Sequence, residues 1–354
     1  MTLIMSADGA RFFALSDIIT VRSGRQDVQV RGLPLVPPHT TTIASDNHTV
    51  VGLAQKSVRY DAQRLLQWAG SEVIARHIWT RLALALVTDP DLSFLEFVSA
   101  LSLADSELQQ VSLIFNRVGP DGRVHREALN AKRANVADAD AVFAGTGEFH
   151  FLGDIRPEFN HPEHRPDHHF LRDWFHRIGY VALTEAVGGE NFMFAYGGWF
   201  EITVCSEGRF RRVPYLVKMW SVRDGEIKSG PCLSGWHTDD HLCLQRAYQR
   251  NDSADSTIDI TIVPDALRRT SGPNSRNDAA ATFVEAELQL HLLLNREDGK
   301  WAVAVVGRDE SNFHFRMDDG KVEIGWSDAL RPQLLRAFEG PHDALIRRPF
   351  TDGK

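Results

Sequence analysis

The chain opens with the stretch Thr2-Leu3-Ile4-Met5-Ser6-Ala7-Asp8-Gly9-Ala10-Arg11-Phe12-Phe13-Ala14-Leu15-Ser16-Asp17. Two apolar runs flank the pair Asp8-Gly9. An Asp-Gly pair in this setting predicts a β-hairpin, because the turn requires positive φ and glycine adopts it without a Cβ clash. We therefore expect a strand that begins at residue 2 and pairs in antiparallel orientation with a strand that ends at Asp17.

The predicted first strand lies unusually close to the start of the sequence. Chain termini fray unless they are tied down, so a core strand at residue 2 suggests that the terminus itself is used. After removal of Met1, Thr2 would carry both a hydroxyl nucleophile and a free α-amine able to accept its proton.

Composition bounds the class of protein. A chain of 354 residues suits one large domain or two. The net charge of −8 argues against broad nucleic-acid binding, which needs a basic surface. No apolar run reaches the roughly 18 residues of a membrane span, and the opening stretch lacks the pattern of a signal peptide. Three cysteines without CxxC spacing favour a reducing compartment. We expect a cytoplasmic protein that binds neither membrane nor nucleic acid.

The remaining pattern alternates blocks of strands with pairs of helices. Strands are predicted at 27–31, 40–45, 49–54, 111–118, 123–127, 140–147, 192–204 and 215–222, and helices at 57–87, 92–103 and 170–186. A strand-rich segment at 255–326 precedes a closing helix at 327–338. Such blocks indicate an α+β protein with helices packed on antiparallel sheets. We divide the chain into a domain at 1–250 and a C-terminal strand-rich extension at 251–354.

Three further stretches follow the hairpin in a familiar order: Thr49-Val50-Val51-Gly52-Leu53-Ala54, Ser112-Leu113-Ile114-Phe115, and Val142-Phe143-Ala144-Gly145-Thr146-Gly147. Together they resemble the proteasome β-type branch of the N-terminal nucleophile (Ntn) hydrolases over about residues 2–225. The resemblance implies a four-layer αββα sandwich, with an additional C-terminal α+β segment.

The resemblance also implies roles for particular residues. Thr2 would be the nucleophile and Asp17 would set the electrostatics of the N-terminal site. The turn that contains Thr146 and Gly147 would help to position the N-terminus, with Thr146 in place of the family's serine.

The family's lysine is not found where its motif predicts it. Arg31-Gly32 matches the family's Lys-Gly-like step, but the lysine's place falls near Val36. Arg31 is therefore the candidate cation of the site, together with Arg22 and Arg25. An arginine stays protonated at neutral pH and cannot take a proton from threonine.

These observations predict a proteasome-like hydrolase that cleaves a peptide or small amide with Thr2, in active or degenerate form, without a cofactor and as a homo-oligomer. The alternative is a non-catalytic assembly or regulatory protein of the same fold. A third option is a metal-dependent hydrolase that uses the histidines of 161–169 or 237–241. Against metal binding, the first stretch suits a solvated loop, and the second suits the cap of a helix at 242–249.

Overall fold

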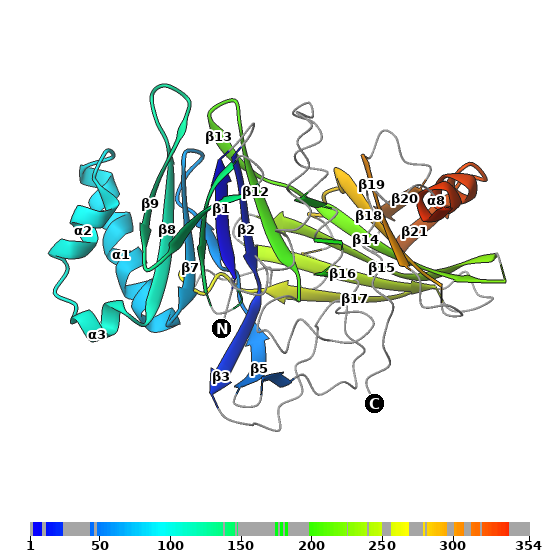
Figure 1. Cartoon of the computed structure of the whole chain (residues 1–354), viewed down its shortest axis with the longest axis horizontal. Helices are drawn as coiled ribbons and strands as arrows, with labels where there is room; N and C mark the ends of the chain where they lie inside the picture. The colour runs from blue at the N-terminus through cyan, green and yellow to red at the C-terminus, as the bar shows by residue number, and fades with distance from the viewer. Residues whose placement is uncertain are drawn as a thin grey trace. The chain divides into compact units, whose positions relative to one another are not determined.

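The computed structural model describes residues 3–8, 12–23, 43–45, 48–136, 139–145, 147, 174–175, 178–179, 181–182, 198–224, 226–238, 241–249, 256–268, 279, 282–295, 301–307, 313–318 and 321–339. The chain forms two compact units (Figure 1). The first contains residues 1–171, 184–212 and 263–272, and the second contains 172–183, 213–262 and 273–354. The division into domains at 1–250 and 251–354 stays a prediction.

The opening hairpin organises the larger sheet of the first unit. The strand order is β10-β11-β1-β2-β12-β13, with β1 at Ile4–Asp8, β2 at Phe12–Asp17, β10 at Lys132–Val136, β11 at Ala139–Ala144, β12 at Phe200–Ser206 and β13 at Arg209–Arg212. Strands β1 and β2 pair antiparallel, with Ile4 opposite Ser16. The predicted hairpin is confirmed. Both strands are almost wholly buried, and each is paired with a strand on either side.

A second sheet has the order β6-β7-β8-β9, with β6 at Ser57–Arg59, β7 at Arg64–Gly70, β8 at Val111–Val118 and β9 at Val124–Leu129. The prediction of one helix over 57–87 is wrong in its first part. Leu65, Leu66 and Ala69 have helical spacing, but they belong to a strand buried on both faces, where apolar residues need not alternate. Gly70 ends this strand at φ +92°, a conformation that favours glycine.

A small third sheet has the order β3-β5-β4, with β3 at Ile19–Ser23, β4 at Ile43–Ser45 and β5 at His48–Leu53. The expected pair of strands around residues 46–48 is confirmed. The strand expected at 27–31 lies outside the described residues.

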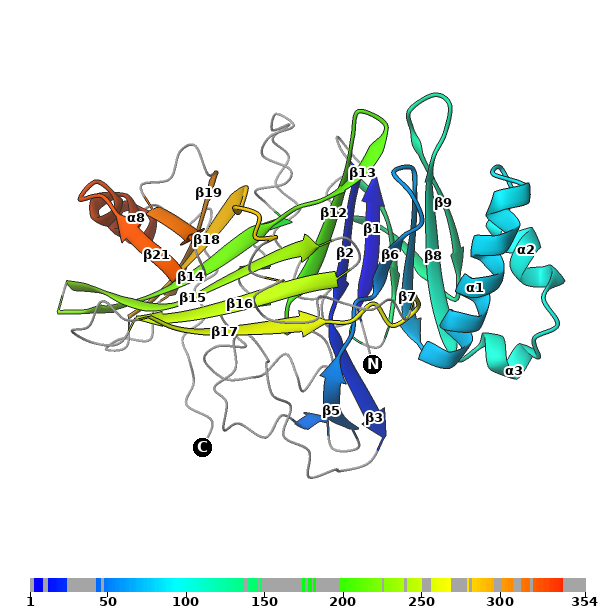
Figure 2. The same cartoon turned by 180° about the vertical axis from the view of Figure 1, so that it is seen from behind.

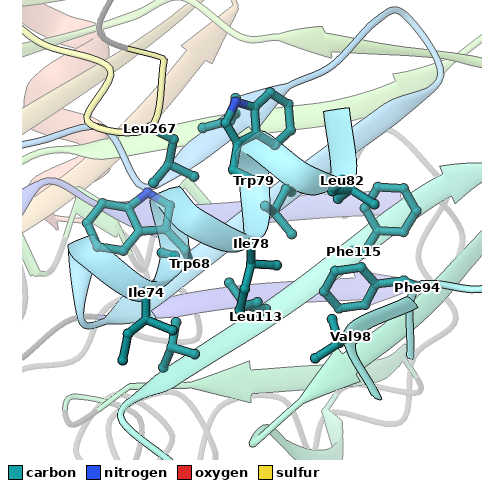
Figure 3. Packing of buried hydrophobic residues seen from close by; sticks show 14 of the residues in the cluster. Trp68, Ile74, Ile78, Trp79, Leu82, Phe94, Val98, Leu113, Phe115 and Leu267 are labelled. Atoms are coloured by element: carbon teal, nitrogen blue, oxygen red, sulfur yellow. The ribbon is translucent and has the colours of Figure 1, made fainter. Parts of the chain in front are cut away.

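Three helices cover one face of the β6–β9 sheet: α1 at Glu72–Thr88, α2 at Phe94–Ala100 and α3 at Asp105–Leu108 (Figures 1 and 2). Figure 3 shows Ile74, Ile78 and Leu82 of α1 pointing toward the sheet. Phe94 of α2 stacks on Phe115 of β8 with ring centroids 5.2 Å apart. This apolar cluster fixes the helices to the sheet.

The other face of the β6–β9 sheet packs against the hairpin sheet. Apolar residues from both sheets meet in two clusters, around Ile4 with Ile114 and around Phe12 with Leu65. The described part of the first unit therefore contains one helical layer and two stacked sheets. This arrangement is α+β, and the four-layer αββα sandwich that the resemblance implies stays a prediction.

A network of buried, hydrogen-bonded polar side chains connects the two sheets. The Gln67 amide donates to the carbonyl oxygens of Met5 and Leu15, at 3.0 and 2.9 Å. Asn116 donates to Gln67, and the Ser6 hydroxyl donates to Asn116 at 2.8 Å. Because buried polar atoms need hydrogen-bond partners, this network fixes the position of the hairpin against the second sheet.

The second unit is built on a six-stranded sheet of order β17-β16-β15-β14-β18-β19. Its strands are β14 at Tyr215–Arg223, β15 at Glu226–Thr238, β16 at His241–Gln249, β17 at Ser256–Val263, β18 at Leu288–Asn295 and β19 at Trp301–Gly307. A two-stranded sheet joins β20 (Phe313–Asp318) to β21 (Lys321–Trp326), and helix α8 (Leu330–Glu339) packs on β18 and β19.

The helix expected at 242–249 is wrong, because those residues form β16, which pairs antiparallel with β15. Residues 241–245 are all buried, so this strand is enclosed on both faces and its sequence shows no clean alternation that would set it apart from a helix. In the helix expected at 170–186, the described residues 174–175, 178–179 and 181–182 are helical. None of the helices formed by described residues is long and apolar enough to cross a membrane.

We predict that Gln67→Ala lowers the free energy of unfolding by about 3 kcal/mol, because two carbonyl acceptors and the Asn116 amide lose their partner in a buried site. Chemical denaturation measures this change. The matched control is Gln63→Ala, an exposed glutamine just before the same strand, which should change stability by less than about 0.5 kcal/mol. Equal effects of the two substitutions would contradict the structural role of Gln67.

Candidate functional site

A buried lysine meets Asp17 where β2 ends. The Lys56 Nζ lies 3.5 Å from Asp17 Oδ1, and the side chains are 1% and 0% exposed. Lys56 Nζ also donates to the carbonyl oxygen of Ile19 at 2.8 Å. The ring of Trp68 lies 5.4 Å from the same nitrogen. Asp17 and Lys56 are thus an ion pair enclosed in the interior of the first unit.

Main-chain hydrogen bonds hold both partners in place. The Asp17 amide donates to the carbonyl oxygen of Leu3, the residue that follows Thr2, at 3.0 Å. The Ala54 amide donates to Ile18, and the Trp68 amide donates to Lys56. The chain between β5 and β6 is therefore fixed on one side by the hairpin sheet and on the other by β7.

Opposing effects act on the Lys56 amine. Burial lowers the pKa of Lys56, because a charged ammonium loses its hydration there, while the charges of Asp17 and Glu201 act to raise it. The net shift is downward. A lysine with a lowered pKa has a larger neutral fraction near pH 7 than an ordinary lysine and is better suited to accept a proton.

Glu201 is a second buried acid at this site. It stands on β12 opposite Ser16, directly beside Asp17 in the sheet register. Its Oε2 accepts the main-chain amides of Lys56 and Ser57 at 2.8 and 3.2 Å. Burial raises the pKa of Glu201 to about 7, against the lowering effect of Arg212 and of these amide donors.

Arg212 and Gln55 extend the polar cluster. Arg212, the last residue of β13, donates to the side-chain oxygen of Gln55 at 3.1 Å and to the carbonyl oxygen of Ser57 at 3.0 Å. Gln55 in turn donates to the carbonyl oxygen of Val263 at 3.0 Å, and its main chain forms a parallel bridge with Asp265. Segments from four parts of the sequence therefore converge on residues 55–57.

The sequence-predicted site residues fall into two groups. Thr2, Arg31 and Thr146 lie outside the described residues. Asp17 and Gly147 are described and buried, and Gly147 lies in a turn. Because Ile4 pairs with both Ala144 and Ser16, the ends of β11, β1 and β2 that lie nearest Thr2 are neighbours. Gly145, at the end of β11, has a φ of +106°.

Sequence reasoning missed Lys56, Glu201 and Arg212. It looked for the family's lysine near Val36, before the strand pair at 43–53, whereas the lysine beside Asp17 follows that pair. One signal was present: Lys56 interrupts a run with few charges from Val50 to Val58, and a lysine is rarely buried without a partner. The helical interpretation of residues 57–70 concealed this signal.

The third option, a metal site at the histidines, receives no support from the described residues. The stretch at 161–169 lies outside them, and His237 and His241 stand on paired strands rather than one helix face. No group of metal-binding side chains occurs in the part of the chain that the structure describes.

Comparisons with known proteins do not identify a family for this chain. No protein-family model matches the chain, and no curated protein matches it. Among solved structures, eukaryotic HslV from Trypanosoma brucei matches with a TM-score of 0.31 and 14% sequence identity. The match covers 57% of this chain and 98% of that one. A TM-score this low does not establish a shared fold.

We predict that Glu201 makes stability fall as pH rises. Its pKa is raised on folding, so its stabilising contribution is full below about pH 4.5 and is lost as pH rises through about 7. Between these values, the wild-type free energy of unfolding should fall by about 3 kcal/mol relative to Glu201→Gln. Urea unfolding across this range measures the difference. Glu96→Gln, at an exposed position, should leave the wild-type profile unchanged, and parallel profiles for wild type and Glu201→Gln would contradict the assignment.

Proposed function

We propose that the first unit is an N-terminal nucleophile hydrolase of amide bonds, in which Thr2 becomes the terminal residue after removal of Met1. The single observation that carries this proposal is the buried Asp17–Lys56 pair beside Leu3. The pair places an amine with a lowered pKa at the end of the hairpin whose first strand follows Thr2. The sequence resemblance of residues 2–17 and 142–147 to proteasome β-type hydrolases points to the same chemistry.

In the proposed reaction, the hydroxyl oxygen of Thr2 attacks the carbonyl carbon of a peptide or small amide. The hydroxyl proton moves to a neutral amine, that of Lys56 or the α-amine of Thr2. The tetrahedral intermediate collapses to an ester, and the leaving amine takes up that proton. Water then hydrolyses the ester, releases the acid and restores the hydroxyl. Asp17 stabilises the ammonium form of Lys56 while it holds the proton.

The turn at Gly145–Gly147 is assigned a positioning role. Backbone amides near the nucleophile are the usual donors to a developing oxyanion, and Gly147 is buried in a turn just beyond the end of β11. Within this proposal, Thr146 and Gly147 orient the terminal residue. Arg31 is not required as the proton acceptor, because Lys56 supplies the amine that an arginine could not.

The proposal predicts a covalent adduct at Thr2. N-terminal sequencing of the purified protein should give Thr2 as the first residue, and an electrophilic threonine-directed probe should add one probe mass that maps to Thr2. Thr2→Ala should abolish the adduct. Lys56→Met should slow its formation by about 100-fold or more, the usual contribution of a proton acceptor.

Lys228→Met is the matched control, because Lys228 is exposed on β15 in the second unit. This variant should react like wild type. Retention of Met1 together with the absence of an adduct would overturn the enzymatic proposal, whereas an adduct at full rate in Lys56→Met would overturn only the role of Lys56.

The alternative, a non-catalytic protein that assembles with copies of itself, is favoured by one observation. Helix α1 exposes Val73, Leu84 and Val87, at 75%, 65% and 73% of their surface. Their spacing of 11 and 3 residues puts them on one face of the helix. Exposed apolar side chains that share one helix face can mark an interaction surface.

Light scattering tests this alternative, which is compatible with catalysis. If copies associate through α1, Leu84→Asp should reduce the measured mass toward that of one chain, while Ser102→Asp, at an exposed position after α2, should not. A wild-type mass of a single chain at high concentration would contradict assembly.

A further inference from the structure

Glu201 has no role in the reaction as outlined, yet it is among the most enclosed charged residues of the first unit. It is 1% exposed, and it accepts two main-chain amides, those of Lys56 and Ser57, through one carboxylate oxygen. An apolar residue on β12 would fill the same interior without the cost of burying a carboxyl group. The carboxyl is therefore placed against the segment that carries Lys56 at an energetic cost.

We propose that Glu201 is a positioning residue that controls the protonation of Lys56, because it holds the main chain at residues 56–57 and its carboxyl is buried in the same interior as the Lys56 amine and Asp17. This inference rests on the proposed function for its catalytic meaning. The electrostatic link between the two side chains does not depend on any hydrolysis.

Glu201 contacts the main chain near both Lys56 and Asp17. Through the amides of Lys56 and Ser57 it fixes the main chain from which the lysine side chain extends. Through β-sheet pairing it stands opposite Ser16, the neighbour of Asp17. The Ser16 and Ser57 hydroxyls are themselves hydrogen-bonded to each other, so the two strands are joined at this point.

Charged groups from several elements face Glu201. Arg212 on β13 lowers the pKa of Glu201, and Asp265, after β17, raises it. Glu201 and Asp17 both act to raise the pKa of Lys56, and Glu72 at the start of α1 adds a smaller effect in the same direction. Burial outweighs the rest and brings the pKa of Glu201 to about 7. The carboxyl therefore changes charge in the pH range where a catalytic amine works.

The charge of Glu201 affects how readily Lys56 releases its proton. Below about pH 7 Glu201 is neutral, its support for the ammonium form of Lys56 is absent, and the amine releases its proton more readily. Above about pH 7 the carboxylate is charged and the ammonium form gains stability. Because the charge of Glu201 acts on the Lys56 amine, the Lys56 resonance should report the titration of Glu201.

Titration of the Lys56 amine by nuclear magnetic resonance, in full-length protein labelled with ¹³C and ¹⁵N lysine, tests this inference. The Lys56 resonance is assigned by its loss in Lys56→Arg. In wild type it should show an inflection near pH 7, which reports Glu201. In Glu201→Gln, whose amide oxygen can still accept both main-chain amides, that inflection should vanish. The neutral fraction of Lys56 at pH 8 should then rise by about threefold or more.

Asp265→Asn is a second variant that leaves Glu201 in place. Asp265 Oδ1 accepts the amides of Leu267 and Arg268, and an asparagine oxygen can do the same. Loss of the Asp265 charge should move the inflection of the Lys56 resonance to lower pH. This variant carries the test if Glu201→Gln does not fold.

The outcomes separate the two proposals. A Lys56 resonance that titrates identically in wild type, Glu201→Gln and Asp265→Asn overturns the inference, even if the protein forms the Thr2 adduct. A wild type without adduct formation, but with the expected titrations, overturns the proposed hydrolase and leaves the control of Lys56 by Glu201 standing. With both intact, the pH profile of adduct formation should shift to lower pH in Glu201→Gln.

Discussion

The ion pair between Lys56 and Asp17 is the constraint around which the first unit is arranged. Two charges are removed from water at the end of the hairpin, and such a pair is stable only when the surrounding groups satisfy it. The carbonyl oxygen of Ile19 and the face of Trp68 meet the ammonium group. Glu201 holds the main chain beneath it. A buried pair adds little to stability compared with an apolar core, so its presence fits a chemical role better than a structural one.

The layers of the first unit hold Lys56 and Asp17 next to each other. Helices α1–α3 pack on the β6–β9 sheet through an apolar cluster. The hydrogen-bonded polar side chains Gln67 and Asn116 then fix the hairpin sheet against the other face of that sheet. The hairpin places Leu3 and Asp17 next to each other, and the segment just before β6 brings Lys56 to Asp17. The end of β17 and the segment after it also contact this site and its apolar surroundings. Val263, the last residue of β17, accepts a hydrogen bond from Gln55, and Leu267 packs near Trp68 and Trp79 (Figure 3).

Local patterns predicted what local interactions determine. The Asp8-Gly9 turn gave the hairpin, and the alternation of Val111–Val118 gave strand β8. Where a strand is buried on both faces, as β7 is, alternation disappears and the sequence resembles a helix. Residues 242–249 were misassigned because a turn motif was interpreted as a helix cap. Strand β20 alternates apolar and polar residues from Phe313 to Asp318, a signal that the sequence interpretation overlooked, whereas helix α3, with four residues, is too short for a periodic signal.

The candidate site was only partly predictable, for a different reason. Asp17 was found because it ends a recognisable hairpin. Lys56, Glu201 and Arg212 come together through pairing between distant strands, which no spacing rule along one chain reveals. The question that decides the account is whether Lys56 and Asp17 depend on each other. A double-mutant cycle with Lys56→Met, Asp17→Asn and the combined variant measures this coupling directly. We expect each single change to lower the free energy of unfolding by about 3 kcal/mol or more, and the combined change to lower it by clearly less than their sum. Strictly additive losses would contradict this expectation.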